Sequence, residues 1–235
     1  MFRWRADEPG LTRAFTDVGA GNLATHVGDD PQEVATRRAA VAAGLGLAPE
    51  RLVFMNQCHG AVVHVVDGPW PGPQVPPGDA LVTAVPDLAL AVLVADCVPV
   101  LLADRGAGVL GAVHAGRPGL AAGVVPATLS AMRELGAREV EAVVGPAVCG
   151  RCYEVPEELR AQVAAVAPVS ATVSWTGTAA LDVASGVVAQ LRAGGAQVAW
   201  LPGCTREDAS LYSYRRAQDC GRFAGIVVRY AGWDR

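Results

Sequence analysis

The stretch 88-LALAVLVADCVPVLLAD-104 is the most apolar part of this chain and decides its fold class. Residues 88–95 form a short apolar run bounded by Asp87 and Asp96. A run of this length between two charged residues is typical of a strand that is buried on both faces. Because Asp96 and Pro99 interrupt the apolar character, the stretch does not span a membrane as a helix. The sequence therefore predicts a fold built around buried strands.

Strands and helices are predicted on both sides of this stretch. Asp30 as N-cap, Pro31 in the first turn and Gly44 near the end predict a helix. Another helix is predicted at 116–136, where Pro126 is expected to break or kink it. The remaining predictions are helices at 156–167 and 182–195, a loop at 71–79, and strands at 51–57, 61–66, 100–103, 108–114, 140–145, 171–175, 197–201 and 225–230.

This order of elements predicts the architecture. Strands and helices mix without strict alternation, which argues against an all-parallel, doubly wound sheet. We therefore expect one α/β or α+β domain over residues 1–235, a layered sandwich of mixed β-sheets flanked by helices. The hydrophobic fraction of 51% and the charged fraction of 18% fit a globular protein.

Charge and cysteine content limit the classes of binding partner and the cellular compartment that we expect. The net charge is −4 and no Lys/Arg block stands out, so a nucleic-acid partner is not expected. The first ten residues lack the apolar core of a signal peptide. Six cysteines are too few for a disulfide scaffold and are expected to be reduced thiols. We expect a cytoplasmic protein with no membrane partner, and the sequence leaves the oligomeric state open.

The stretch 56-NQCHGAVVHVV-66 contains two of the four histidines in the chain. If it is one continuous strand, Cys58 and His59 point to opposite faces, and so do His59 and His64. The local cluster therefore does not form a site by itself. Any partners of His59 must come from other parts of the chain.

Two other strand ends offer such partners. Cys97 follows the buried run, and His114 ends a predicted strand just before a Gly/Pro turn. Together with His59 they make a three-ligand metal site with a fourth position open for water or substrate, which is typical of catalytic zinc, although copper also suits these donors. The spacing of the three residues matches no known zinc signature. From residue types alone, ordinary surface or hydrogen-bonded histidines therefore remain an alternative.

A series of short motifs resembles a known family. In chain order the motifs are NQCHGAVV, GDALVT, VADCVPVLLAD, AVHAGRPGL, VGPAVCGRCYEV, CTRE, LYSYRR and CGRFAGIVV. On these motifs the chain is similar to the YfiH-like "laccase domain" family, formerly called multicopper polyphenol oxidases, from about Phe15 to Val228. The resemblance implies a metal, usually zinc, held by His59, Cys97 and His114. It also implies purine nucleoside phosphorylase activity with adenosine deaminase activity, or a role in peptidoglycan editing.

Several further residues are candidates for the reaction. Arg117 opens a predicted helix after His114 and is a candidate phosphate ligand, or else a solvated residue of an ordinary turn. Arg117 also marks a departure from the family, whose usual HAGWRG reads HAGRPG here. Asp96 is a candidate acid–base residue, or it only positions Cys97. The candidate substrate-binding residues are Arg117, Asn22, Arg216 and Arg222.

The C-x-x-C of Cys149 and Cys152 is interpreted as structural. One such pair cannot supply four cysteines to zinc, and a redox role would need a thioredoxin-like strand–helix context. Cys204 and Cys220 likewise have no histidine nearby in the sequence. We expect Cys97 to be the only cysteine that is essential for activity.

The sequence therefore predicts a zinc-dependent purine nucleoside phosphorylase with adenosine deaminase activity, acting on adenosine, inosine or methylthioadenosine, with phosphate as the second substrate. Three alternatives stay open. Cys97 could be a nucleophile activated by His59 or His114 in a hydrolase that edits peptidoglycan precursors. A copper polyphenol oxidase is disfavoured, because four histidines cannot furnish a blue-copper site and a trinuclear cluster. The chain could also be a metal-stabilised binding domain without enzyme activity.

Overall fold

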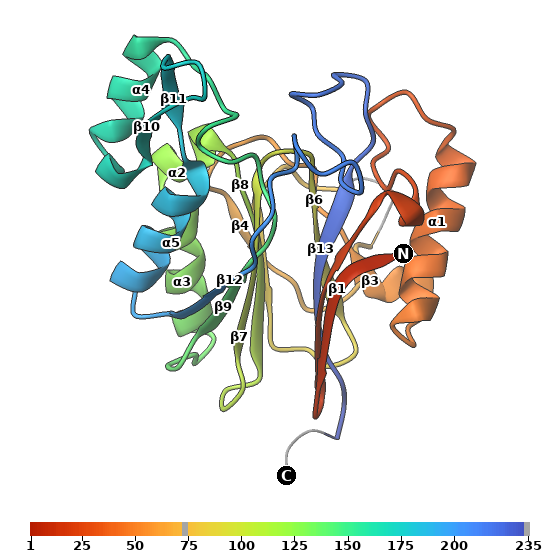
Figure 1. The fold of residues 1–235 in the computed structure, drawn as a ribbon. Coiled ribbons are helices and arrows are strands. Elements are labelled where there is room, and N and C mark those ends of the chain that lie inside the picture. Colours follow the sequence, from red (N-terminus) through yellow and green to blue (C-terminus); the bar gives the residue numbers. More distant parts are fainter. Residues whose placement is uncertain (72–74, 233–235) are drawn as a thin grey trace.

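Two mixed β-sheets pack face to face between two layers of helices in the computed structural model, which describes residues 1–71 and 75–232 (Figure 1). One sheet has the strand order β12-β9-β7-β8-β5-β4 and the other β1-β2-β13-β6-β3, while β10 and β11 form a separate pair. The predicted layered sandwich of mixed sheets is thereby confirmed. The predicted loop at 71–79 lies partly outside the described residues.

The bounds of the elements are as follows. The α-helices are α1 Pro31–Gly44, α2 Arg117–Ala122, α3 Val124–Glu134, α4 Glu157–Ala164 and α5 Val183–Ala193, with short 3-10 turns at Val18–Ala20, Pro49–Arg51 and Pro168–Ser170. The strands are β1 Phe2–Glu8, β2 Leu11–Thr16, β3 Leu52–Val53, β4 Val63–Val65, β5 Ala80–Thr83, β6 Ala89–Val94, β7 Val98–Asp104, β8 Val109–Ala115, β9 Glu141–Val144, β10 Ala171–Val173, β11 Ala179–Leu181, β12 Gln197–Trp200 and β13 Phe223–Arg229.

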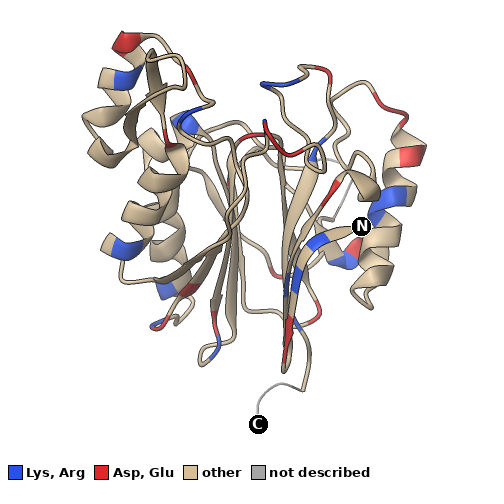
Figure 2. Cartoon of the chain, in the orientation of Figure 1, with Lys and Arg blue, Asp and Glu red and all other residues tan. Residues whose placement is uncertain are grey.

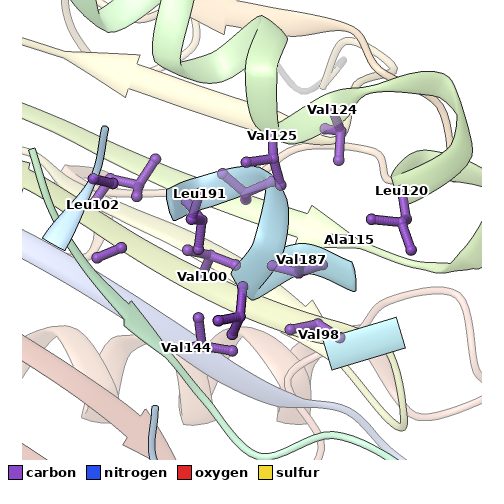
Figure 3. Packing of buried hydrophobic residues seen from close by; sticks show 14 of the residues in the cluster. Val98, Val100, Leu102, Ala115, Leu120, Val124, Val125, Val144, Val187 and Leu191 are labelled. Carbon is purple, nitrogen blue, oxygen red and sulfur yellow. The ribbon is translucent and has the colours of Figure 1, made fainter. Parts of the chain in front are cut away.

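The apolar stretch 88–104 supplies one central strand to each sheet. Along β6, Ala89 and Ala91 pack in the cluster beside α1, whereas Leu90 and Val92 face the other sheet. Strands β7 and β8 and their neighbours bury their outer face against α2, α3 and α5 (Figure 3). Both faces of these strands are apolar because both are covered. Each fully buried leucine or valine contributes about 1.5–3 kcal/mol relative to an exposed one.

Charged residues lie mainly on the outer helices, the loops and the ends of strands, and the facing sheets between them are largely uncharged (Figure 2). Among the described residues, no helix combines the length and the apolar character needed to cross a bilayer. Asp30 caps α1 as predicted, since its side chain accepts a hydrogen bond of 2.8 Å from the N–H of Gln32.

The helix predicted at 116–136 is broken, but not at Pro126. The break falls at Gly123, whose φ of 82° is left-handed and ends α2. Pro126 is the third residue of α3, where a backbone N–H has no partner inside the helix and a proline is tolerated.

The predicted strands at 51–57 and 61–66 are shorter in the structure, where they form β3 and β4. The residues between them are irregular, with a bridge from Asn56 to Pro77. The N-terminal hairpin β1–β2 was not predicted, nor were β5 and β11. In β1 the residues alternate between half-buried and exposed, and charged side chains such as Arg3 and Arg5 occupy the exposed positions. A charged edge strand of this kind has a weak apolar signal.

Strand directions bring the candidate residues to one edge. In the antiparallel pair β7–β8, Pro99 lies opposite His114, so Cys97 and His114 sit at the same end. The starts of β4 and β5 and the ends of β9 and β12 reach that end too, because β5 is antiparallel to β8, β9 is antiparallel to β7, and β12 is parallel to β9. The site is therefore assembled by loops at this edge.

Candidate metal centre and its cavity

Asp79, directly before β5, organises the site. Its carboxylate is completely buried, and one oxygen accepts the His59 backbone N–H at 2.9 Å and lies 2.8 Å from Nδ1 of His114. The other oxygen accepts the Gly60 N–H at 2.6 Å and the Cys58 thiol at 3.1 Å. Burial opposes ionisation, but the hydrogen bonds from His114 and Cys58 outweigh it and hold the pKa of Asp79 at about 2. Asp79 is therefore an ionised carboxylate that fixes two site segments.

His59 is presented by a turn and not by a strand. Its φ is 61°, a left-handed backbone that costs about 1–2 kcal/mol for a residue other than glycine. The two hydrogen bonds that Asp79 accepts from the N–H groups of His59 and Gly60 compensate this cost. His59 and its neighbours therefore do not alternate along a continuous strand, yet the neighbours still face other groups: Cys58 points to Asp79, and His64 contacts the Pro77 carbonyl at 2.9 Å.

The structure brings His59, Cys97 and His114 together. Their ligand atoms all lie within 4.8 Å of one another, and Cys97 Sγ is 3.7 Å from Nε2 of His59. Because the ionised Asp79 accepts a hydrogen bond from Nδ1–H of His114, Nε2 of that ring is left for a ligand. Two imidazoles and a thiol at this spacing fit a zinc or copper ion with one position open for substrate.

Gly116 is required by the same arrangement. A Cβ atom at this position would come within 2.8 Å of the His59 ring and 3.1 Å of Cys97 Sγ. Any side chain here would push the two donors apart. The glycine of the sequence motif AVHAG therefore makes room for the metal group.

Charge within the group favours a thiolate. Burial raises the pKa of Cys97, but the charge and hydrogen bond of His114, followed by those of His59, lower it to about 6. Burial likewise opposes protonation of His114, but the charge of Cys97 and the hydrogen bond to Asp79 raise the pKa of its imidazole to about 9. At neutral pH and without a metal, Cys97 and His114 thus form a thiolate–imidazolium pair.

A cavity of about 420 Å³ opens over the three donors. Besides the donors, it combines cationic and aromatic side chains, and the guanidinium of Arg215 packs 4.6 Å from the ring centre of Tyr153. The polar and aromatic lining includes His26, Arg117, Tyr153, Tyr214, Arg215 and Arg222.

Asp96 lines the cavity, but its carboxylate accepts hydrogen bonds from two neighbouring loops. One oxygen accepts the Thr205 hydroxyl at 2.5 Å and the other accepts the Arg215 N–H at 2.7 Å. Its backbone carbonyl accepts the Val148 N–H at 3.0 Å, and its φ is 93°. With both oxygens engaged, this geometry favours a positioning role over acid–base chemistry.

The candidate substrate residues divide into two groups. Arg117 and Arg222 line the cavity. Arg216 is not among the lining residues, because its guanidinium donates to backbone carbonyls, including Thr205 at 2.7 Å. Asn22 is not among them either, and its Oδ1 accepts the N–H of Arg222 at 2.9 Å and holds that segment in place. Both residues shape loops in this structure and do not face the cavity.

Three site residues were missed by the sequence-based reasoning. Asp79 had a signal in the motif GDALVT, where an acid precedes an apolar strand. Tyr153 lies in the motif CGRCYEV, and Arg215 is the immediate neighbour of the chosen Arg216. His26, one of the four histidines of the chain, also lines the cavity.

A known protein family matches the chain over residues 12–230, and its description is multi-copper polyphenol oxidoreductase laccase. The chain belongs to this family. The resemblance found in the sequence motifs is thereby confirmed.

Curated relatives carry the name purine nucleoside phosphorylase. One from Streptomyces coelicolor is 59% identical over 209 residues, covering 88% of this chain and 86% of the relative. One from Streptomyces griseus is 53% identical over 227 residues, covering 91% and 92%. One from Deinococcus radiodurans is 42% identical over 204 residues, covering 85% and 78%.

Solved structures share the fold along nearly the whole chain. A Neisseria meningitidis protein superposes with a TM-score of 0.86 at 30% identity, covering 98% of this chain and 99% of that one. YlmD from Geobacillus stearothermophilus superposes with a TM-score of 0.84 at 29% identity, covering 94% and 92%.

Proposed function

We propose that this protein is a metal-dependent purine nucleoside phosphorylase. The observation that carries the proposal is a single cavity of about 420 Å³ that holds a three-donor metal group together with arginines and tyrosines. The names of relatives up to 59% identical support the same activity. The cavity volume falls in the range typical of small-molecule sites.

The arginines suit the phosphate substrate. Arg117, Arg215 and Arg222 line the cavity, and among its described lining residues Asp96 is the only carboxylate. Because both oxygens of Asp96 already accept hydrogen bonds, its charge is partly offset within the wall. The cavity is therefore cationic, and guanidinium groups bind phosphate oxygens in pairs.

The aromatic residues suit the nucleoside. Tyr153 and Tyr214 present rings to the cavity, and purine bases stack on such rings. His26 also lines the cavity, and burial, followed by the charges of Arg222 and Arg38, lowers its pKa. A neutral imidazole at this place can hold one hydrogen bond to a purine nitrogen.

Phosphorolysis needs both the arginines and the aromatic residues of this cavity. A phosphate oxygen forms a bond to the anomeric carbon of the ribose, while the bond from that carbon to the purine nitrogen breaks and the electron pair leaves with the base. The arginines hold and orient the attacking phosphate, and hydrogen-bond donors on the wall stabilise the leaving purine. His59, Cys97 and His114 would hold the metal, and Asp79 orients His114. When bound, the metal supplies Lewis-acid chemistry, and we propose zinc.

A second activity, the nucleoside substrates and the cellular location are part of the same proposal. Deamination of adenosine at the same site would use water in place of phosphate and release ammonia. Adenosine, inosine and methylthioadenosine are the proposed nucleosides, and the cytoplasm is the proposed location, since all six cysteines are free thiols.

Copper oxidase chemistry is less well supported, despite the family description. Multi-copper oxidation needs several copper sites rich in histidine. The chain has four histidines, and only His59 and His114 meet at the metal group.

A second candidate function follows from one observation. The thiol of Cys97 has a lowered pKa and lies beside two histidines, an arrangement that can activate a nucleophile. The protein would then be a cysteine hydrolase of peptidoglycan precursors that needs no metal.

Steady-state kinetics with adenosine and inosine, with and without phosphate, separate these functions when they are paired with metal analysis. Purine release that requires phosphate and is abolished by a chelator supports the proposal. Ammonia release without phosphate identifies deamination. His64→Ala is the matched control for His114→Ala, because His64 contacts the Pro77 carbonyl outside the cavity lining. Full activity in chelated protein would overturn the metal-dependent mechanism.

A further inference from the structure

A second group of metal-ligand side chains lies outside the lining of the described cavity. Cys149, Cys152, Cys204 and Glu207 each offer one ligand atom, and these atoms all lie within 4.8 Å of one another. Cys152 is buried, with 3% of its surface exposed, and its thiol donates to the Glu207 carboxylate at 3.4 Å. The group joins residues about 55 positions apart in the sequence.

The fold places the two pairs side by side. Cys149 and Cys152 follow β9, and Cys204 and Glu207 follow β12, the parallel neighbour of β9. The two loops continue this pairing beyond the strands through a bridge between Ala147 and Cys204. In addition, the Cys149 N–H donates to Sγ of Cys204 at 3.4 Å. The convergence therefore follows from the sheet and its register.

Both loops also make the same turn. The Cys152 N–H donates to the Cys149 carbonyl at 2.9 Å, and the Glu207 N–H donates to the Cys204 carbonyl at 3.1 Å. Each turn brings the side chains three positions apart to one side. The resulting pattern, C-x-x-C followed by C-x-x-E, has the internal spacing of structural zinc sites.

We propose that Cys149, Cys152, Cys204 and Glu207 form a second, structural zinc site. Three sulfur donors and one carboxylate oxygen complete a four-coordinate shell, so no position is left for a substrate. Sulfur-rich donor sets select zinc among the common divalent ions. The proposal does not depend on the reaction catalysed in the cavity.

A disulfide explains the group less well. It would join two of the three thiols and leave the third thiol and the carboxylate without a role. All three cysteines are free in the structure. Simple apolar packing does not explain why a carboxylate approaches the buried thiol of Cys152.

The site would hold two walls of the cavity together. Val148, next to Cys149, lines the cavity and donates to the Asp96 carbonyl at 3.0 Å. Thr205, next to Cys204, donates its hydroxyl to the Asp96 carboxylate at 2.5 Å. A metal that ties Cys149 to Cys204 therefore fixes these two of the contacts of Asp96, and through them the cavity.

Zinc stoichiometry of the whole chain tests the proposal. Protein purified under reducing conditions, loaded with zinc and freed of excess metal is expected to hold two zinc ions per chain. Cys204→Ser is expected to lower the content to one, whereas Cys220→Ser, a cysteine outside both groups, keeps both ions. Zinc content in Cys204→Ser equal to that of the unmodified protein would overturn the proposal.

A second variant keeps the test decisive if Cys204→Ser does not fold. The double variant Cys97→Ser/His114→Ala removes the cavity group and leaves the proposed site intact. Loaded with Co²⁺, it is expected to bind one ion and show the sulfur charge-transfer bands and tetrahedral spectrum of several thiolate ligands. Absence of these bands would contradict the proposal, and so would a disulfide among Cys149, Cys152 and Cys204 found by mass spectrometry of the reduced-purified chain.

Discussion

The His59/Cys97/His114 group and the Cys149/Cys152/Cys204/Glu207 group lie at loops of the same sheet edge, yet their surroundings differ. The first has three donors, an ionised aspartate behind one histidine and a cationic cavity in front. The second has four donors from two matched turns. Three donors with an open position suit chemistry, whereas four donors suit a structural role. The number of donors and the neighbouring cavity therefore distinguish the two groups better than the types of their residues.

The largest expected effect comes from removing a donor of the first group. His114→Ala should lower kcat/KM for phosphorolysis by at least about 10²-fold, a loss of the size seen when one strong electrostatic stabiliser is removed. Steady-state kinetics measure it, with His64→Ala as the control that keeps activity. If both variants retain equal activity, the first group is not part of the active site.

The orienting role of Asp79 predicts the next effect. Asp79→Asn should weaken zinc binding by about 10–100-fold, as loss of a partner behind a metal-bound histidine typically does. Competition with a chelator measures the affinity. Asp104→Asn is a matched buried carboxylate, which accepts a backbone N–H from Glu139 at 2.7 Å. An equal loss of zinc in both variants would indicate general destabilisation.

Arg117 lines the cationic cavity that the His59/Cys97/His114 group faces, so its loss should affect the reaction and not the second group. Arg117→Ala should raise the phosphate KM by about tenfold or more, since a hydrogen bond to a charged group contributes about 1.5–3 kcal/mol. Zinc content should not change. Arg51→Ala, outside the cavity lining, is the control. An unchanged phosphate KM would mark Arg117 as an ordinary residue of the turn.

The second group should affect stability more than chemistry. Cys204→Ser should lower Tm, by about 2–4 °C for each kcal/mol of lost stability in a chain of this size. The kcat should fall less than in His114→Ala, because the effect reaches the cavity only through the contacts of Asp96. Calorimetry with and without zinc measures the Tm. A Tm that zinc raises equally in Cys204→Ser and the unmodified protein would contradict a second site.

The smallest effect is a pH dependence of the metal-stripped protein. The lowered pKa of Cys97 contributes to the free energy of unfolding. This contribution is fully present above pH 9.0, the ordinary pKa of a cysteine, and is lost as the pH falls through about 6. The raised pKa of His114 contributes stability that is present below 6.5 and is lost as the pH rises through about 9. Between these limits the two contributions to the change of unfolding free energy with pH have opposite signs.

Unfolding stability from this pair should therefore stay nearly flat between about pH 6.5 and 9, because the folded pair and the unfolded chain bind equal numbers of protons. The ultraviolet absorbance of the thiolate should nevertheless rise with a midpoint near 6. Cys97→Ser should lose this signal. A midpoint near the ordinary cysteine value would contradict the thiolate–imidazolium pair.

The sequence predicted the parts of the molecule that local chemistry determines. Continuous apolar runs indicated the buried strands, and Asp30 with Pro31 indicated the start of α1. His59, Cys97 and His114 could be selected because strand ends and motif order pointed to them together. Their convergence in the structure agrees with that selection.

Other features depend on contacts that no sequence pattern records. Asp79 matters because it accepts hydrogen bonds from two separate segments. Cys149 meets Cys204 only through the register of β9 and β12. The choice between Arg215 and Arg216 depends on an irregular loop, which has no periodicity to show which side chain faces the cavity.

We propose that the cavity with His59, Cys97 and His114 carries out metal-dependent phosphorolysis. The most direct measurement follows phosphorylated ribose formed from inosine and phosphate by metal-stripped protein before and after one equivalent of zinc is restored to this group. Cys149→Ser/Cys204→Ser is the background, so that zinc has only the cavity group to occupy. We predict that sugar phosphate forms only when zinc, phosphate and nucleoside are all present. Equal formation without zinc, or hypoxanthine release without any sugar phosphate, would contradict metal-dependent phosphorolysis in this cavity.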